Sequence, residues 1–213
     1  MTTTLGEAAT NVLAKTLRPW NGEKITEPGI YSGINMVSYH GDIADGPSIS
    51  SSGLRTIERE SPLHFWHDSF LNPDRPVQEQ KDHFNLGSAV HTLLLGEEGF
   101  SDQFVIRPAQ FTNWTTNAAK AWRDEMVALG KSVLVPDDLE KIKGIARMVA
   151  KEPIVQQGLF SGLVENSAFW KDKETGVWLK SRPDVLNLDA DIIADLKTTA
   201  SADGDSCQRA ISE

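Results

Sequence analysis

Cysteine, long hydrophobic runs and basic charge are all scarce in this sequence. Cys207 is the single cysteine among 213 residues, which excludes a disulfide-stabilised scaffold and an iron–sulfur cluster held by several cysteines. No apolar run approaches the ~20 residues that span a membrane. The N-terminal segment lacks the basic and apolar regions of a secretory signal. These absences predict a cytoplasmic protein without a membrane partner.

The charge balance is acidic, with 21 Lys and Arg residues against 30 Asp and Glu residues and a net charge of −9. A protein that coats DNA through bulk electrostatics is usually basic, so this class is disfavoured. The same charge does not exclude an enzyme that holds a metal ion with clustered carboxylates. The sequence also lacks a Gly-x-x-x-x-Gly-Lys-Ser/Thr loop, so ATP hydrolysis is not expected.

The order of the sequence patterns predicts an arm followed by one domain. Residues 1–47 show little hydrophobic periodicity and contain several turn-forming residues, so we expect an extended N-terminal arm with one short strand. Residues 48–213 are expected to form the domain. Caps and helical periodicity predict helices over 50–60, 62–70, 82–95, 117–129 and 136–151, with short strands over 104–107 and 132–135.

The pattern changes to a period of two in the C-terminal part of the sequence. Alternating residues predict strands over 163–171, 177–188 and 192–198, joined by turns at 173–176 and 187–191. Residues 205–213 indicate the start of another helix. Helices followed by an antiparallel β-meander are typical of an α+β fold rather than an alternating βαβ fold.

The last predicted strand carries two charged side chains on one face, Asp195 and Lys197. The preceding strand delivers Asp184, and the turn between the strands can bring the two carboxylates together. Carboxylates that close repel unless a cation neutralises them, and oxygen ligands suit Mg²⁺ or Mn²⁺. A neighbouring lysine can orient a water molecule and neutralise developing phosphate charge. The pattern therefore indicates metal-assisted hydrolysis of a phosphodiester.

These residues also resemble a known family. Arg182-Pro183-Asp184, eleven positions before Asp195-Leu196-Lys197, resembles the core of the PD-(D/E)xK nucleases, which have a restriction-endonuclease-like fold. The local sequence resembles the exonuclease VIII (RecE-like) branch of the RecB-like nucleases. Three further stretches support the resemblance, namely residues 48–54 with 61–64, residues 87–91, and Glu165 with Phe169 and Trp170.

The resemblance implies a role for each matching residue. Asp184, Asp195 and Lys197 match the catalytic residues, and Glu165 matches an outer-shell acid. The implied ligands of the metal ion are His91, Asp184, Asp195 and the carbonyl group of Leu196. Gly87 lies on the helical face of His91 and would let another backbone approach. Two further side chains, Arg182 and Lys180, are candidates for contacts to DNA phosphates, with a solvated strand face as the alternative.

The resemblance implies a Mg²⁺-dependent exodeoxyribonuclease that degrades double-stranded DNA from 5′ to 3′ and serves recombination in a phage or prophage. Family members form homo-oligomeric rings and work with a single-strand annealing recombinase. The family continues into a helix with a Gln-x-x-x-Tyr motif. This sequence ends near the expected start of that helix, so we expect the nuclease domain to be incomplete at its C-terminus.

Other interpretations of the same residues stay open. The chain could be a catalytically inactive, truncated homologue that acts as a DNA-binding or assembly protein, or a helical interaction module with a β appendage and no metal. His91 could be a core histidine, and Asp195 with Lys197 a surface ion pair. The tryptophans are expected chiefly in the core, with base stacking as the alternative for Trp114 or Trp170.

Overall fold

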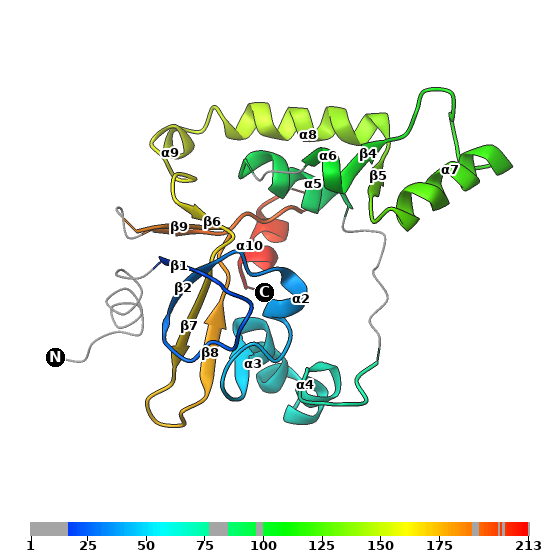
Figure 1. Cartoon of the computed structure of the whole chain (residues 1–213). Coiled ribbons are helices and arrows are strands. Elements are labelled where there is room, and N and C mark those ends of the chain that lie inside the picture. The colour runs from blue at the N-terminus through cyan, green and yellow to red at the C-terminus, as the bar shows by residue number, and fades with distance from the viewer. Residues whose placement is uncertain are drawn as a thin grey trace. The chain divides into compact units, whose positions relative to one another are not determined.

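The computed structural model describes residues 17–76, 85–96, 100–188, 192–199, 201 and 203–212. These residues form two compact units that alternate along the chain. The first unit contains the described residues between 17 and 76 and between 161 and 194. The second unit contains those between 85 and 160 and between 195 and 212. Figure 1 shows the elements of both units, which are described separately below.

In the described part of the first unit, five strands form one mixed sheet in the order β1-β2-β7-β8-β3. The strands β2, β7 and β8 pair antiparallel, and the outer strands β1 and β3 pair parallel to β2 and β8. Their bounds are β1 Leu17–Pro19, β2 Gly29–Ser32, β3 Ser48–Ser50, β7 Ser167–Lys171 and β8 Trp178–Ser181. The β7–β8 hairpin turns where the sequence predicts it, and Gly176 adopts the positive φ of 71° that this turn needs.

A second sheet of the first unit has the order β10-β9-β6 within the described residues, and both of its pairings are antiparallel. Its strands are β6 Leu163–Val164, β9 Val185–Asn187 and β10 Ile192–Ala194. Leu186 of this sheet packs with Ile30 and Ala168 of the five-stranded sheet. The two sheets of the first unit are thus joined by a shared hydrophobic cluster.

Three described helices belong to the first unit, α2 Met36–Tyr39, α3 Ser51–Arg59 and α4 Pro62–Asp68. The predicted caps of the last two are confirmed. The hydroxyl oxygen of Ser50 accepts a hydrogen bond from the N–H of Gly53, and that of Ser61 accepts one from the N–H of His64. Pro62 occupies the first turn of α4, where its missing N–H costs nothing.

The main core of the first unit lies on the other face of the five-stranded sheet. It joins side chains of the sheet, such as Phe169 and Trp178, to residues of the N-terminal segment. The N-terminal members of this core are Ile25, Tyr31, Ile34, Tyr39, Ile43 and Ala44. The expectation of an N-terminal arm is therefore wrong for residues 17–47, because they supply two strands of the sheet and most of this cluster. Residues 1–16 lie outside the described part.

The second unit consists of helices around one short parallel pair of strands, β4 Phe104–Ile106 and β5 Ser132–Leu134. Its core joins α5, α8 and these strands through Ala89, Val90, Phe104, Leu134 and Ile142. Figure 1 shows α8 alongside α5. The helices are α5 Asn85–Leu94, α6 Phe100–Gln103, α7 Asn117–Ala128, α8 Pro136–Val149, α9 Pro153–Gln156 and α10 Gly204–Ser212.

Most helix ends of the second unit agree with the sequence signals. Thr116 caps α7, Pro136 opens α8, and Gly96 and Gly130 take positive φ values of 67° and 74° after α5 and α7. The start of the helix predicted over 82–95 lies outside the described residues. The architecture as a whole is the α+β fold expected from the sequence.

Two of the predicted strands are each broken into two pieces. Residues 163–171 form β6 and β7, and residues 177–188 form β8 and β9, so each predicted strand passes from one sheet to the other. Glu165 has a φ of 54°, which interrupts an extended backbone. Pro183 has no N–H and cannot continue a ladder of hydrogen bonds. The single meander is therefore two sheets that separate at residues 165–166 and 182–184.

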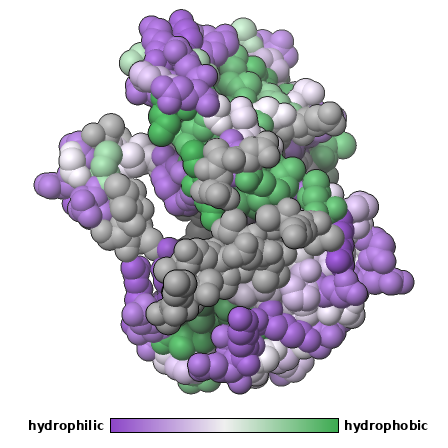
Figure 2. Space-filling view, turned by 90° about the vertical axis from the view of Figure 1, so that its left-hand side faces the viewer, coloured by the Kyte–Doolittle hydropathy of each residue, from purple (hydrophilic) through white to green (hydrophobic). Residues whose placement is uncertain are grey.

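Apolar side chains also reach the surface, among them Val37, Leu63 and Ile193, which are 84%, 70% and 69% exposed. Figure 2 shows hydrophilic and hydrophobic residues intermixed on one face of the molecule. Among the described helices, none combines the length and the hydropathy that crossing a bilayer would require.

Candidate metal centre

Three neighbouring strands of the β6–β9–β10 sheet end next to an acidic residue. The last register positions are Val164 opposite Val185, and Val185 opposite Ala194. The next residue on each strand at this end is an acid, and these acids are Glu165, Asp184 and Asp195. The N–H of Glu165 still donates to the carbonyl oxygen of Asp184 at 3.0 Å. Strand register therefore brings three carboxylate-bearing residues to one end of the sheet.

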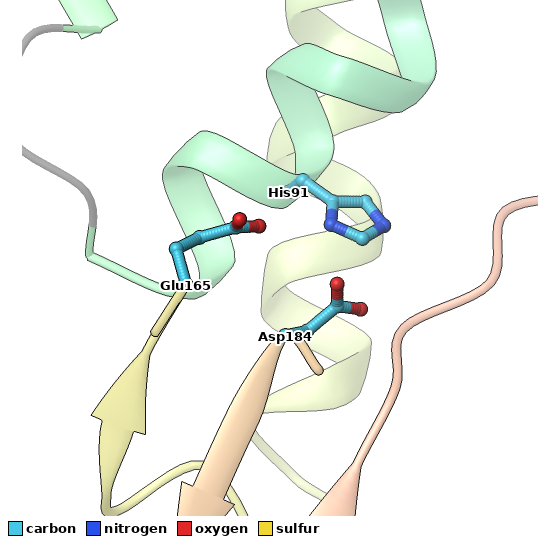
Figure 3. Close-up of side chains that lie close together, drawn as sticks. All are labelled: His91, Glu165 and Asp184. Carbon is cyan, nitrogen blue, oxygen red and sulfur yellow. The ribbon is translucent and has the colours of Figure 1, made fainter. Parts of the chain in front are cut away.

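Glu165 and Asp184 lie close together within the first unit. A carboxylate oxygen of Glu165 lies within 4.8 Å of one of Asp184. Figure 3 shows both side chains extending from the ends of neighbouring strands. Asp184 is only 8% exposed, whereas Glu165 is partly exposed. Two carboxylates this close repel, so the arrangement favours a cation between or beside them.

Arg182 is a cation that holds the carboxylate of Glu165 in place. Its Nε donates to Oε2 of Glu165 at 2.6 Å, and its Nη1 donates to the carbonyl oxygen of Ile34 at 2.5 Å. The guanidinium therefore ties the kink at Glu165 to the segment before α2. Arg182 was predicted to contact DNA phosphate, but in the structure its side chain is engaged inside the first unit and is 14% exposed.

Lys180, the other candidate for a DNA contact, is also engaged inside the first unit. The residue is 5% exposed, and its ammonium donates to the carbonyl oxygen of Tyr39 at 2.7 Å. The ammonium also lies 5.1 Å from the ring centre of Tyr39 and 5.5 Å from that of Phe70. Burial lowers the pKa of Lys180 to about 8. The solvated strand face is wrong for Lys180, because Tyr39 and Phe70 cover its side chain, whereas the DNA contact stays a prediction.

The remaining predicted residues belong to the second unit. Nε2 of His91, on α5, donates to the carbonyl oxygen of Leu196 at 2.6 Å. The resemblance implies both residues as metal ligands, His91 through its ring and Leu196 through its carbonyl group. Adjacent ligand atoms around Mg²⁺ lie about 3 Å apart, since each stands 2.0–2.1 Å from the ion. Their spacing is thus close to that of two neighbouring positions in such a coordination sphere.

Gly87 allows the segment that follows Asp195 to run close to α5. A Cβ atom at Gly87 would stand 2.9 Å from Oγ1 of Thr198, which is closer than normal contact distances allow. The sequence predicted that a glycine one turn before His91 admits a neighbouring segment. In the structure this neighbour is the side chain of Thr198, three residues after Asp195.

Asp195 and Lys197 lie side by side in the second unit. The ammonium of Lys197 is 2.5 Å from Oδ2 of Asp195, and the two side chains are 65% and 46% exposed. The strand itself is shorter than predicted, since β10 ends at Ala194. The pairing therefore comes from an irregular segment beside α5 rather than from the alternation of a β-strand.

Glu165 lies closer to Asp184 in the structure than its predicted outer-shell role implies. The outer-shell assignment did not predict that Glu165 breaks its strand with a positive φ and stands directly beside Asp184. One signal was available, because Glu165, Asn166 and Ser167 are three consecutive polar residues inside a stretch interpreted as one strand. Such a run disrupts simple alternation and is typical of a bend or bulge.

One of two comparisons with known proteins identifies a family for this chain. A search of curated proteins gave no match. A family model described as a PDDEXK-like domain of unknown function (DUF3799) matches residues 50–213, a range that includes every candidate site residue named above. The match supports the PD-(D/E)xK superfamily and a nuclease-type fold, without singling out the exonuclease VIII branch. The chain therefore belongs to the family of PDDEXK-like domains known as DUF3799.

Proposed function

We propose that this chain is a metal-dependent deoxyribonuclease, with Asp184, Asp195 and Lys197 as its catalytic residues. The observation that carries the proposal is the register of β6, β9 and β10, which ends three adjacent strands in acids at one edge. The membership of a PDDEXK-like family supports the same chemistry. We propose further that His91 and the carbonyl group of Leu196 complete the ligand set.

The donor set fits a hard divalent cation. Carboxylate oxygens and a carbonyl oxygen are ligands that Mg²⁺ and Mn²⁺ prefer, and one imidazole nitrogen is compatible with Mn²⁺. Asp184 is nearly buried, so its charge is costly unless a cation or several hydrogen bonds offset it. Glu165 adds a further carboxylate next to Asp184. We favour Mg²⁺, with Mn²⁺ as a substitute.

The residues of the chain have separate tasks in this mechanism. A divalent cation, when bound, supplies Lewis acidity toward a phosphoryl oxygen. The ammonium of Lys197 orients the attacking water and stabilises the charge that develops on the phosphate. Asp195 holds this ammonium in place through their ion pair. Asp184 and His91 are the side chains that would hold this cation.

The finer assignment follows from the resemblance to exonuclease VIII. We propose that the substrate is double-stranded DNA, degraded from the 5′ end to leave a 3′ overhang for recombination. A homo-oligomeric ring and a single-strand annealing recombinase are the partners that this assignment implies. Enclosure by a ring would explain how a chain with a net charge of −9 retains a polyanion.

The test is cleavage of a linear duplex labelled at either the 5′ or the 3′ end. We expect degradation with Mg²⁺, none with EDTA, and faster loss of the 5′ label. Asp184→Asn and Lys197→Ala should each reduce cleavage by at least 100-fold. Glu174→Gln and Lys173→Ala, in the exposed β7–β8 turn, are matched controls and should leave it unchanged.

Three outcomes would contradict parts of the proposal. Cleavage that persists in EDTA would exclude metal dependence. Equal loss of both labels would exclude a 5′-specific exonuclease. Metal binding without any cleavage would instead assign the chain the role of a catalytically inactive DNA-binding or assembly protein.

A further inference from the structure

The second unit carries a group of aromatic and arginine side chains outside the candidate metal centre. The group lies on the segment between β4 and β5, partly before α7 and partly on it. It consists of Arg107, Phe111, Trp114, Trp122 and Arg123, and we call it the arginine–tryptophan cluster.

Trp114 is the centre of this cluster. Its ring is nearly parallel to that of Trp122, with an interplanar angle of 9° and 6.3 Å between ring centres. The guanidinium carbons of Arg107 and Arg123 lie 5.2 Å and 5.9 Å from the centre of the Trp114 ring. Phe111 lies 6.0 Å from Trp122 and extends the group. Two guanidinium groups and one further ring, that of Trp122, are thus gathered around the half-buried indole of Trp114.

The two arginines are held differently. Within the described residues, the buried Nε of Arg107 has no hydrogen-bond partner, so the contact with Trp114 orients its guanidinium. Arg123 donates to Oδ1 of Asp124 at 3.0 Å, and both side chains are exposed. Exposed ion pairs of this kind contribute at most about 1 kcal/mol, so a phosphate can replace Asp124 at low cost.

The charge pattern of the sequence supports a polyanionic ligand at this cluster. Residues 103–123 contain three basic residues, Arg107, Lys120 and Arg123, and no acidic residue, although the whole chain has a net charge of −9. Lys120 is exposed on α7, one turn before Arg123. The remaining exposed positions before α7 are small or polar, such as Thr112, Asn113 and Thr115. The segment is a basic and aromatic stretch in an otherwise acidic protein.

We infer that the arginine–tryptophan cluster binds single-stranded DNA, with a base stacked on the aromatic side chains and the adjacent phosphates bound by Arg107, Lys120 and Arg123. Aromatic rings bind unstacked bases without sequence preference because every base has a π face. In a duplex the bases are already stacked and paired, so a duplex would offer this cluster only its phosphates. Single-stranded DNA is therefore the form that can contact both the aromatic rings and the basic side chains of the cluster.

This inference goes beyond the proposed nuclease function and does not require cleavage. A 5′-to-3′ exonuclease leaves a single strand as its product, and a site for that strand on the same chain would retain it. The binding can be measured in EDTA, where no metal-dependent step occurs. Failure of the nuclease proposal and failure of this one therefore give different results.

The test is fluorescence anisotropy with a labelled oligothymidine of about 20 nucleotides in EDTA, repeated over a series of salt concentrations. Trp114→Ala should weaken binding about 10- to 100-fold, whereas Trp114→Phe keeps a stacking ring and should weaken it less than 5-fold. Arg107→Gln should lower the slope of log K against log salt by about 0.7, the value for one phosphate contact on a single strand.

Matched controls separate binding from folding and from bulk charge. Arg147→Gln, at an exposed position of α8 in the same unit, makes the same charge change and should leave both the affinity and the slope unchanged. Thermal unfolding of each variant, followed by circular dichroism, identifies any that fail to fold. A folded Trp114→Ala that binds like the wild type would overturn the inference, as would tighter binding of a blunt duplex than of oligothymidine.

Discussion

The N–H of Glu165 donates to the carbonyl oxygen of Asp184 at 3.0 Å, one position beyond the last strand pair of β6 and β9. This bond continues the strand register past the point where both strands end. It places the two carboxylate-bearing residues at the junction between the two sheets of the first unit. The candidate metal centre is thus built where the backbone leaves regular structure.

The link between Arg182 and Glu165 is the first target for mutation. Arg182→Met removes the guanidinium that binds both Glu165 and the carbonyl group of Ile34. Breaking a fully buried pair costs 3–5 kcal/mol, and for this partly exposed pair we expect about 2 kcal/mol. Urea unfolding measures the change. A double-mutant cycle with Glu165→Gln should give a coupling energy above about 1 kcal/mol, and an additive double mutant would contradict the link.

Gly87 and Gly144 form a matched pair of helical glycines in the second unit. Gly144→Ala, in the open interior of α8, should stabilise the protein by about 0.5–1 kcal/mol because alanine favours the helix. Gly87→Ala should instead destabilise it by about 1 kcal/mol, since the new methyl group meets Thr198 at 2.9 Å. Thermal unfolding compares the two variants. Adding Thr198→Ala should restore most of the loss at Gly87, and failure of this rescue would contradict the predicted contact.

Lys180 should make the stability of the protein depend on pH. Burial lowers its pKa to about 8 in the folded state from 10.5. Between pH 8 and 10.5 the unfolded chain binds the proton more strongly, so the free energy of unfolding rises with pH by up to about 1.4 kcal/mol per pH unit. Below pH 8 both states are protonated and the penalty of the buried charge is constant. Above pH 10, Tyr39 opposes this rise, because burial raises its pKa to about 12.

The measurement is urea unfolding at several pH values between 7 and 10. Lys180→Met removes the titrating group, so we expect its curve of stability against pH to be flatter than that of the wild type in this range. Lys173→Met, at an exposed position of the β7–β8 turn, is the control and should keep the wild-type slope. Equal slopes for the wild type and Lys180→Met would show that Lys180 does not titrate here.

Divalent metal should stabilise the folded chain even without DNA. A ligand at 100 times its dissociation constant raises the free energy of unfolding by about 2.7 kcal/mol. We expect Mn²⁺ to increase the melting temperature, EDTA to reverse the increase, and Asp184→Asn to abolish it. Calcium should give a smaller shift, because its preferred ligand distances are longer. A Mn²⁺ shift that Asp184→Asn leaves intact would place the ion elsewhere.

Local signals predicted most helices of the described chain. The caps Ser50 and Ser61 each act within three residues of sequence, so the pattern of side chains is sufficient to locate them. The turn at Gly176 has the same local character. These features depend on hydrogen bonds between residues that are close in sequence, so they can be predicted from the sequence alone.

The breaks in the strands depend on contacts that the sequence does not display. Glu165 takes a left-handed backbone because Arg182 and Asp184 hold it, and both lie more than fifteen residues away. The role of residues 17–47 was missed for a similar reason. Ile25, Ile34 and Ile43 are each at most 4% exposed, but their spacing of nine matches neither a helix nor a strand. Their burial comes from tertiary packing.

The candidate site was predictable in its residue types and less so in its geometry. The order Asp184, Asp195, Lys197 is visible in the sequence, and the structure pairs Asp195 with Lys197. The burial of Lys180 was not visible, because alternation along β8 does not reveal that Tyr39 and Phe70 cover that face. Sequence patterns identify which side chains a strand presents, while the elements that cover them come from distant parts of the chain.

The alternation of the two units along the chain has a consequence for synthesis on the ribosome. The central strands β7 and β8 pair with β2 and β3, which precede them by more than a hundred residues. The five-stranded sheet cannot close until residues 167–181 have been translated, whereas the stretch from α5 to α9 is complete before then. The intervening helices can therefore fold while β2 and β3 are still unpaired. A chaperone that shields these two early strands would raise the yield of the folded protein.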